Sequence, residues 1–302
     1  MKNKKILILG ASGMLGIEVL REFSKKKNVI IYATIRNTAD KKIIKNYLKK
    51  DFEKIRWIKF RIEKNYINRL KILVKNKDFI INCIGTIKPY INEQKASSIE
   101  NATNVNSVFP HRLNSVVNRK CKIFQIATDC VYNGKDGNYR ENSDHNAIDI
   151  YGKSKSIGEV KSENFYNIRC SIIGKEIKNF KSLLCWFLGQ KKNASIFGFK
   201  DHLWNGVTTF HFAKIVTIII LKKVKIPNML HIIPNHPINK YKLLKLFQKR
   251  FKRSDIKINK INSNLTINRT LKTNYININK LINFKLGNKK IQSIEKMIDE
   301  IY

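Results

Sequence analysis

The sequence has no long apolar run and little glycine or proline. The longest apolar run, Ile215–Leu221, spans seven residues, whereas a membrane-spanning helix needs roughly 18 or more. Only 13 Gly and 5 Pro occur among 302 residues, which excludes collagen-like and low-complexity architectures. The apolar run near the start, Ile6–Leu9, is too short for a secretory signal peptide. We therefore expect a globular, cytoplasmic protein without a membrane span.

Cysteine is also scarce, and its placement argues against disulfides and metals. The five cysteines are odd in number and show no Cys-x-x-Cys spacing, so neither a disulfide framework nor a zinc site is indicated. Several lie in apolar, strand-like runs, as expected for reduced, buried thiols. The six histidines form no His-x-x-x-His pair. The sequence therefore predicts no bound metal.

Acidic residues are few, with 22 Asp and Glu against 60 Lys and Arg and a formal net charge of +38. Such an excess can attract nucleic acids or anionic membranes. Here the lysines are spread from Lys2 to Lys296 among abundant Ile and Asn, and no basic run is interleaved with aromatics. Lys, Ile and Asn share A/T-rich codons, so compositional bias accounts for the charge and no specific nucleic-acid partner is expected. A basic surface still favours anionic substrates such as nucleotides.

Apolar runs of strand length alternate with amphipathic stretches of helix length through the first half of the chain. The expected strands are 5–9, 29–36, 55–62, 79–84, 122–127 and 166–172, and the expected helices are 13–26, 41–50, 66–75, 99–117 and 150–164. This alternation predicts βαβ units and a parallel sheet. Beyond it the pattern loosens into expected helices at 183–190, 209–222, 241–251 and 290–301, a strand at 229–233, and an asparagine-rich stretch at 256–283.

The predicted fold class is therefore α/β, a Rossmann-type doubly wound parallel sheet with a smaller α+β part on the C-terminal side. Residues 1–170 are expected to form the Rossmann domain, to which 209–222 and 229–233 return. Residues 171–208 and 234–302 are expected to form the smaller, substrate-binding part. No internal repeat is present.

A glycine-rich turn follows the first expected strand and opens the first expected helix. Its glycines, Gly10, Gly13 and Gly16, form a G-x-x-G-x-x-G motif. In such a turn the first glycine permits the bend, the second lets the backbone approach a pyrophosphate, and the third allows close helix–strand packing. The helix N-terminus adds unpaired N–H groups and partial positive charge. The motif predicts dinucleotide binding; the alternative is a turn whose glycines serve packing alone.

The second expected strand ends at Arg36. Sites selective for NAD place Asp or Glu about 20 residues after the glycine turn, on the ribose hydroxyls, whereas Arg suits the 2′-phosphate of NADP. Arg36 therefore favours NADPH as the cofactor, with NADH as the other option. A solvated arginine is the alternative interpretation in a chain so rich in basic residues.

A tyrosine and a lysine lie one helical turn apart at Tyr151 and Lys155. Residues at i and i+4 share a helix face, and an ammonium beside a phenol favours the phenolate and lowers its pKa. Tyr151 is thus a candidate proton donor to a carbonyl that is being reduced. Thr128 follows the strand 122–127, and the carboxyl end of a parallel strand faces the ligand crevice. We expect Thr128 and Tyr151 to meet over one substrate carbonyl.

These motifs, in this order, resemble the extended short-chain dehydrogenase/reductase superfamily. Within this superfamily, several sequence segments are similar to those of the dTDP-4-dehydrorhamnose reductase (RmlD-like) sugar-nucleotide family. The segments that carry this resemblance are Asn82–Lys88, Asn106–His111, Thr128–Gly134, Tyr151–Lys155, Trp204–Thr209 and Asn268–Leu271. The resemblance covers nearly the whole chain.

The resemblance implies roles for individual residues. The cofactor would be held by Gly10, Ser12, Gly13, Met14, Leu15, Gly16, Arg36, Cys83, Ile84, Gly85, Tyr151 and Lys155. The catalytic set would be Thr128, Tyr151 and Lys155. The substrate side would comprise Thr128, Asp129, Asn106, Trp204 and Arg269.

For three of these residues the sequence is equally compatible with a purely structural role. Asn106 would support a proton relay to Lys155 or serve as a packing asparagine. Trp204 would stack on a nucleotide base or belong to the core. Arg269 would pair with the substrate diphosphate or be one more surface arginine.

Two positions depart from the family pattern. Arg61 stands where the family commonly has an acidic residue near the adenine, and Ile172 stands where rhamnose-forming members have a substrate-contacting tryptophan. The expected function is NADPH-dependent reduction of the 4-keto group of a nucleotide-diphospho-6-deoxy sugar for surface-polysaccharide synthesis. The alternatives are an epimerase or dehydratase of the same superfamily, or a catalytically silent RmlD-like regulatory subunit. A homodimer is an option that the sequence leaves open.

Overall fold

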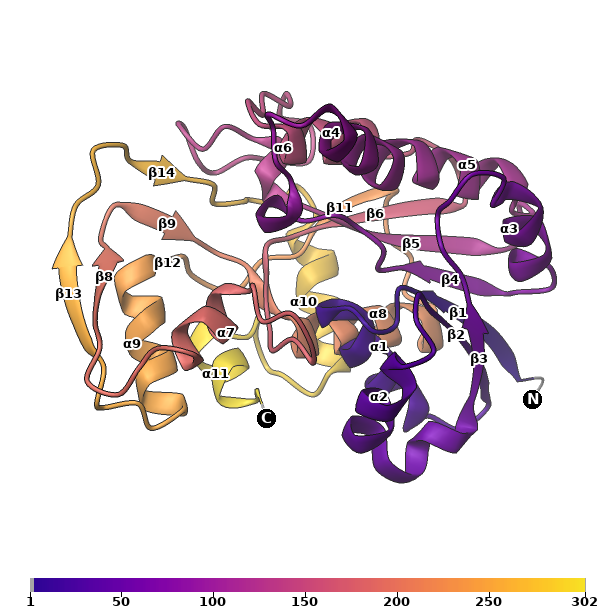
Figure 1. Cartoon of the computed structure of the whole chain (residues 1–302), viewed down its shortest axis with the longest axis horizontal. Helices are drawn as coiled ribbons and strands as arrows, with labels where there is room; N and C mark the ends of the chain where they lie inside the picture. Colours follow the sequence, from indigo (N-terminus) through magenta and orange to yellow (C-terminus); the bar gives the residue numbers. More distant parts are fainter. Residues whose placement is uncertain (1–2, 302) are drawn as a thin grey trace.

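A seven-stranded parallel sheet forms the centre of the larger half of the protein (Figure 1). The computed structural model describes residues 3–301. Along the sheet the strand order is β11-β6-β5-β4-β1-β2-β3. The strands are β1 (Lys4–Leu9), β2 (Val29–Ile35), β3 (Ile55–Lys59), β4 (Phe79–Asn82), β5 (Lys122–Ala127), β6 (Phe165–Arg169) and β11 (Met229–His231). The strand order reverses at β1, which lies between β2 and β4, and a crevice opens there at the carboxyl ends of the strands.

Helices cover both faces of this sheet, as expected for a doubly wound α/β fold. On one face lie α1 (Met14–Ser24), α2 (Asp40–Leu48), α8 (Thr209–Leu221) and α10 (Ile276–Lys285). On the other face lie α3 (Ile67–Val74), α4 (Ala96–Thr103), α5 (Phe109–Val116) and α6 (Ile150–Ile157). Each layer buries its own apolar core against the sheet. The predicted Rossmann-type architecture is confirmed.

A smaller group of elements lies at the carboxyl ends of the strands (Figure 1). It contains the parallel pair β8 (Ser195–Phe199) and β13 (Lys257–Ile261), and the strand β9 (His202–Trp204) between β12 (Ile238–Asn239) and β14 (Ile267–Asn268). A short pair, β7 (Ile172–Ile173) and β10 (Val207–Thr208), completes the strands. The helices α7 (Leu183–Leu188), α9 (Lys240–Arg250) and α11 (Ile294–Asp299) pack around a separate apolar core.

Two expected helices differ from the structure, and one contact explains both. The helix expected over 150–164 ends at Ile157, and the helix expected over 99–117 contains a π-helical turn at Asn104–Val108. Gly158 packs directly on this turn: a Cβ built at Gly158 would lie 1.8 Å from the carbonyl oxygen of Asn106. Only a glycine permits such an approach, so α6 stops where it meets the π-helical turn.

The second half of the chain also departs from the expected pattern. The asparagine-rich stretch 256–283 forms β13, β14 and α10. Three short strands that the sequence did not predict, β8, β9 and β12, organise the smaller part. β9 and β12, with three and two residues, are too short to show a period of two, whereas the five residues of β8 alternate between exposed and buried positions.

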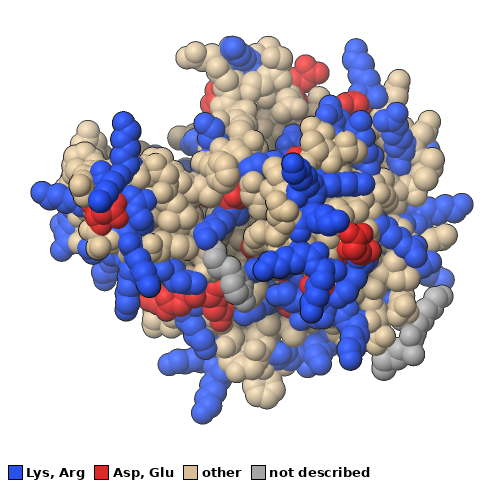
Figure 2. Space-filling view, turned by 60° about the horizontal axis from the view of Figure 1, so that its bottom comes forward, with Lys and Arg blue, Asp and Glu red and all other residues tan. Residues whose placement is uncertain are grey.

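On the face drawn in Figure 2, basic side chains are spread across the surface rather than gathered in one patch. On the face shown, Lys and Arg lie over most of the visible surface, with few Asp or Glu between them. Within residues 3–301, no helix has the length and apolar character that crossing a membrane would require.

Candidate functional site

A cleft of about 930 Å³ opens at the carboxyl ends of β1, β2, β4 and β5. One wall is the glycine-rich turn after β1, and another is the start of α6. The segment 176–183, which enters from the smaller part, also lines the cleft. This is the position at which a doubly wound sheet binds its ligand.

The glycine-rich turn has the geometry that a pyrophosphate site needs. Gly10 adopts a φ of +77°, in the left-handed region, and its N–H donates to Thr34 Oγ1 at 2.9 Å. Gly13 is extended at the start of α1, where no side chain caps the first turn. The first N–H groups of α1 therefore remain available to an anion. The sequence-predicted residues Gly10, Ser12, Gly13, Met14 and Leu15 all line the cleft.

Gly16, unlike Gly10 and Gly13, lies behind the glycine-rich turn rather than on the cleft wall. It does not line the cleft, and a Cβ built there would lie 2.1 Å from the carbonyl oxygen of Gly10. The third glycine thus permits α1 to pack on the turn itself. It supports the shape of the phosphate site from behind.

Two arginines lie side by side at the end of the cleft that β2 and β3 form. Arg36 follows β2 and Arg61 follows β3, and both line the cleft. Arg61 Nε donates to the carbonyl oxygen of Arg36 at 3.0 Å, which joins the ends of the two strands. The replacement of an acidic residue by Arg61 therefore adds a second cation to this end. The pair suits a phosphate more than a ribose hydroxyl.

The loop after β4 forms the opposite end of the cleft, with Cys83, Ile84 and Gly85 along its wall. Burial raises the pKa of the Cys83 thiol to about 12, and the nearby Lys155 ammonium acts in the opposite direction. This loop is fixed from behind by Asn106. Its Oδ1 accepts from the Thr86 N–H and its Nδ2 donates to the Thr86 carbonyl, both at 2.9 Å.

The three candidate catalytic residues, Thr128, Tyr151 and Lys155, line the same cleft. α6 begins sharply because Asp149 caps it, accepting the Gly152 N–H at 2.8 Å. Lys155 is buried and its Nζ donates to the carbonyl oxygen of Ile126 at 2.9 Å. Desolvation lowers the pKa of Lys155 to about 8.

The pKa of Tyr151 differs from the expectation that Lys155 lowers it. Desolvation by burial raises the pKa of the phenol well above its usual range, and a side-chain hydrogen bond with Thr128 acts in the opposite direction. Lys155 does not offset this rise in the pKa of Tyr151, because its ammonium is directed at the Ile126 carbonyl oxygen. At neutral pH the phenol therefore keeps its proton, which is the state that a proton donor requires.

Asp129 lines the cleft and is buried next to Thr128, whose hydroxyl donates to Asp129 Oδ1 at 3.2 Å. Burial raises the pKa of Asp129, and the charge of Arg269 acts against this rise. Arg269 itself does not line the cleft. Its guanidinium donates to the carbonyl oxygens of Tyr132 and Asn133, at 3.0 and 3.3 Å.

Two other sequence-predicted substrate residues lie outside the cleft lining, Asn106 and Trp204. Asn106 is 1% exposed, and besides its bonds to Thr86 it donates to Ser154 Oγ at 3.1 Å. It therefore connects the loop after β4 to α6. Trp204 lies on β9 in the smaller part, half-buried, over Gly206.

Sequence reasoning missed two features of the site. The first is Lys178, whose Nζ contacts Ser12 Oγ at 3.1 Å and Asp40 Oδ2 at 2.5 Å across the cleft. Among 60 Lys and Arg residues, no local signal distinguishes this lysine. The second is an apolar cavity of about 450 Å³ in the smaller part.

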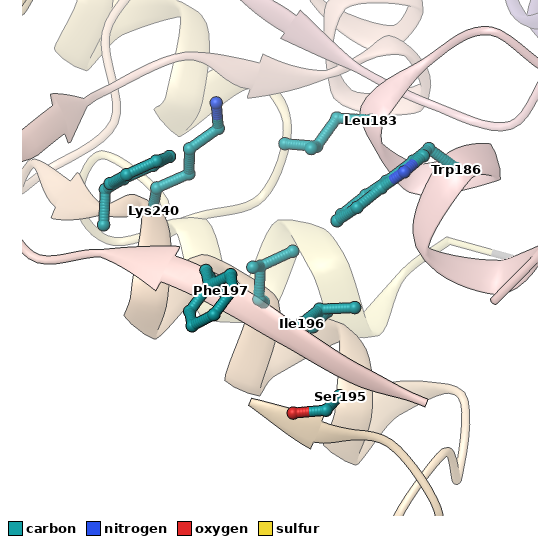
Figure 3. A pocket seen from close by; sticks show the side chains of 8 residues that line it. Leu183, Trp186, Ser195, Ile196, Phe197 and Lys240 are labelled. Carbon is teal, nitrogen blue, oxygen red and sulfur yellow. The ribbon is translucent and has the colours of Figure 1, made fainter. Parts of the chain in front are cut away.

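Trp186 and Leu183 form one side of this apolar cavity, and Phe197 and Lys240 face them (Figure 3). Leu183 lines both the cavity and the cleft, so the two spaces adjoin. Trp186 is 43% exposed, which leaves its ring accessible from the cavity mouth. Phe187, the next residue of α7, is by contrast fully buried in the core of the smaller part.

Among residues 3–301, no cluster of three or more His, Cys, Asp or Glu side chains has an arrangement that suits a metal ion.

The fold and the cleft together define a Rossmann-type protein of the nucleotide-binding class, with the ligand crevice at the carboxyl ends of its parallel strands. The family profile described as RmlD substrate binding domain matches residues 4–275. The chain belongs to this family.

Solved structures with the same fold include enzymes that act on nucleotide sugars. The dTDP-4-dehydrorhamnose reductase of Clostridium acetobutylicum is 19% identical, with a TM-score of 0.71 over 98% of this chain and 97% of that chain. That of Bacillus anthracis, in complex with NADP, is 18% identical, with a TM-score of 0.72 over 99% and 98%.

A third structure, a mutant UDP-glucuronic acid 4-epimerase of Bacillus cereus with NAD and a fluorinated UDP-sugar, is 17% identical, with a TM-score of 0.73 over 98% and 96%. At these identities the likeness shows the shared fold. Comparison with curated proteins finds no significant match.

Proposed function

We propose that the protein is an NADPH-dependent reductase of the 4-keto group of a nucleotide-activated 6-deoxy sugar, serving surface-polysaccharide synthesis. The observation that carries the proposal is that Thr128, Tyr151 and Lys155 line one cleft together with the glycine-rich turn. A phenol that keeps its proton, a hydroxyl beside it and a buried ammonium are the groups that carbonyl reduction needs. The family to which the chain belongs and the reductases with the same fold support it.

The cofactor residues divide into two groups. The N–H groups at the start of α1 and the turn Gly10–Leu15 hold the pyrophosphate, and Arg36 holds the adenosine 2′-phosphate. Cys83, Ile84 and Gly85 line the nicotinamide ribose, to which Lys155 also binds. When bound, the reduced nicotinamide supplies the hydride that the 4-keto carbon accepts.

The proton comes from the chain itself. Tyr151 donates its phenolic proton to the C4 oxygen as negative charge develops on that oxygen. The Thr128 hydroxyl, which donates to Asp129 Oδ1 in the free protein, turns to donate its hydrogen bond to the same oxygen. The tyrosine then regains a proton from solvent. The Lys155 ammonium is directed at the Ile126 carbonyl oxygen in the free protein, so it would have to turn toward Tyr151 to stabilise the transient phenolate.

The rest of the substrate extends from the cleft into the adjoining apolar cavity. The sugar lies beside Thr128 and Asp129. The diphosphate of the substrate passes Leu183, which borders both the cleft and the apolar cavity. The nucleobase stacks on the accessible face of Trp186, since base–aromatic stacking contributes about 1–3 kcal/mol per base. Lys240, which also borders the cavity, supplies a cation near the diphosphate.

The experiment is turnover with purified protein. A dTDP-4-keto-6-deoxy sugar and NADPH are mixed with the protein, nicotinamide absorbance is followed, and the product is identified by mass spectrometry. Consumption of NADPH with a product two mass units heavier than the keto sugar supports the reductase. An unchanged product mass with an isomerised sugar would instead indicate an epimerase, and binding without any turnover would indicate a silent regulatory subunit.

A further inference from the structure

A loop from the smaller part reaches across the cofactor cleft. We call residues 175–182 the strap. Its two ends are held together, because Ser182 Oγ donates to the Gly174 carbonyl oxygen at 3.1 Å and the Ser182 N–H donates to Glu176 Oε2 at 2.6 Å. At its tip Asn179 and Phe180 adopt φ values of +70° and +53°. A left-handed phenylalanine is uncommon, so contacts elsewhere must hold this conformation.

Those contacts are made across the cleft. Lys178 bridges two elements of the Rossmann half, Ser12 in the glycine-rich turn and Asp40 at the start of α2. The side chains of Lys178 and Asp40 are only 23% and 11% exposed. The neighbouring Asn179 forms a side-chain hydrogen bond with Tyr90. The strap thus touches the cleft wall at three points.

Asp40, the partner of Lys178, lies near the point where a dinucleotide site distinguishes NAD from NADP. A dinucleotide site recognises the adenosine 2′ position at the end of its second strand, with a carboxylate for a ribose hydroxyl and an arginine for a 2′-phosphate. This protein has both groups there: Arg36 follows β2, Asp40 opens α2, and both line the cleft. An unpaired carboxylate would repel a 2′-phosphate and favour the hydroxyl.

We propose that Lys178 determines cofactor specificity: by pairing with Asp40 beside Ser12, it cancels the carboxylate that favours NADH and adds a cation that binds the 2′-phosphate of NADPH. Arg36 and Lys178 then form a two-cation phosphate site, with one cation from each half of the protein. This inference rests on the proposed use of NADP(H). It assigns a binding role to a residue outside the Rossmann half.

The test measures the dissociation constants of NADPH and NADH by calorimetric titration. Lys178→Met should weaken NADPH by roughly ten- to a hundredfold, the range of a charge-assisted hydrogen bond, and change NADH little. Asp40→Asn should strengthen NADPH, because it leaves the Lys178 ammonium free for the phosphate. In the Lys178→Met background, Asp40→Asn should recover part of the lost NADPH affinity. Adenosine 2′,5′-bisphosphate and ADP, titrated in the same way, isolate the adenosine half.

The matched control is Lys175→Met, which removes one positive charge from the same strap. Its Nζ lies over the Phe251 ring, 5.0 Å from the centroid, and it does not line the cleft. Thermal unfolding of each free variant checks that the fold is retained. An unchanged ratio of NADPH to NADH affinity in Lys178→Met, or an equal loss of both cofactors, would overturn the inference. A wild-type protein that binds neither cofactor would instead overturn the proposed function.

Discussion

Arg169 and Glu159 form a two-point ion pair in the interior of the protein. Arg169 Nη2 donates to Glu159 Oε2 at 2.5 Å and Nε donates to Oε1 at 3.2 Å, and the arginine side chain is 0% exposed. The other terminal nitrogen, Nη1, is directed at the Tyr132 hydroxyl at 2.6 Å and at His231 Nε2 at 2.8 Å. Glu159 follows α6, and its charge partly offsets the lowering of the Lys155 pKa by burial. The pair therefore lies next to the helix that carries Tyr151 and Lys155.

Arg169→Met should destabilise the fold by roughly 3–5 kcal/mol, because it leaves the Glu159 carboxylate buried without its partner. Urea unfolding measures this loss. Lys45→Met is the control, since the ion pair of Lys45 with Glu53 lies on the surface, with side chains 62% and 72% exposed. That variant should change stability by less than about 1 kcal/mol. Equal effects of the two substitutions would contradict the buried role of Arg169.

His145 accepts a hydrogen bond from Arg169 Nη2 at 2.7 Å. Burial and the arginine charge lower the pKa of His145 to about 4. Between pH 6.5 and 4 the unfolded chain therefore binds a proton that the folded protein does not, and stability falls as the pH falls through this window. His145→Gln should make the decline between pH 7 and pH 5 shallower without abolishing it, because burial also lowers the pKa values of His211 and His231 to about 4. Urea unfolding at each pH measures the change. A decline as steep as in the wild type would show that other groups cause it.

Tyr151→Phe removes only the phenolic oxygen, so α6 and the glycine-rich turn should be undisturbed. Turnover should fall by roughly 10²–10⁴-fold, the usual contribution of a positioned general acid. NADPH binding should persist. The quenching of nicotinamide fluorescence on binding measures the NADPH affinity of the variant. If the variant retained near-wild-type reductase activity, Tyr151 would not be the proton donor.

Lys155→Met should lower turnover and also weaken NADPH, because Lys155 is proposed to bind the nicotinamide ribose as well as to support Tyr151. Its loss and that of Tyr151→Phe should combine in a non-additive way, as is usual for residues that act as one unit. Turnover and NADPH affinity of the two single variants and the double variant are the measurements. Fully additive losses would indicate that the two residues act separately.

Arg36→Asp should weaken NADPH far more than NADH, since it replaces attraction by repulsion at one phosphate. Arg119→Asp makes the same charge change at an exposed turn outside the cleft and serves as the control. Calorimetric titration of both cofactors gives the two ratios. Equal affinities of the wild-type protein for NADPH and NADH would refute the preference itself.

The first half of the fold could be predicted from the sequence because its signals are local. Buried strands such as β1 and β5 are nearly continuous apolar runs, and Gly10 and Gly13 mark the turn between a strand and a helix. Tyr151 and Lys155 share a helix face by spacing alone. Parallel strands then bring these separate segments to one edge of the sheet.

The remaining features depend on contacts between distant segments. Lys178 pairs with Asp40, which lies 138 positions away in the sequence. No local sequence pattern predicts such a pairing. α6 ends early because Gly158 meets the Asn106 carbonyl oxygen, which is a property of the packed structure. The raised pKa of Tyr151 likewise follows from burial, which helix spacing does not report.

The strap continues without interruption into Leu183, the residue that borders both the cleft and the apolar cavity. Lys178 and Leu183 thus belong to one short, continuous segment. A ligand that contacts Lys178 in the cleft would act through this segment on a wall of the apolar cavity, so we expect occupation of the two spaces to be coupled.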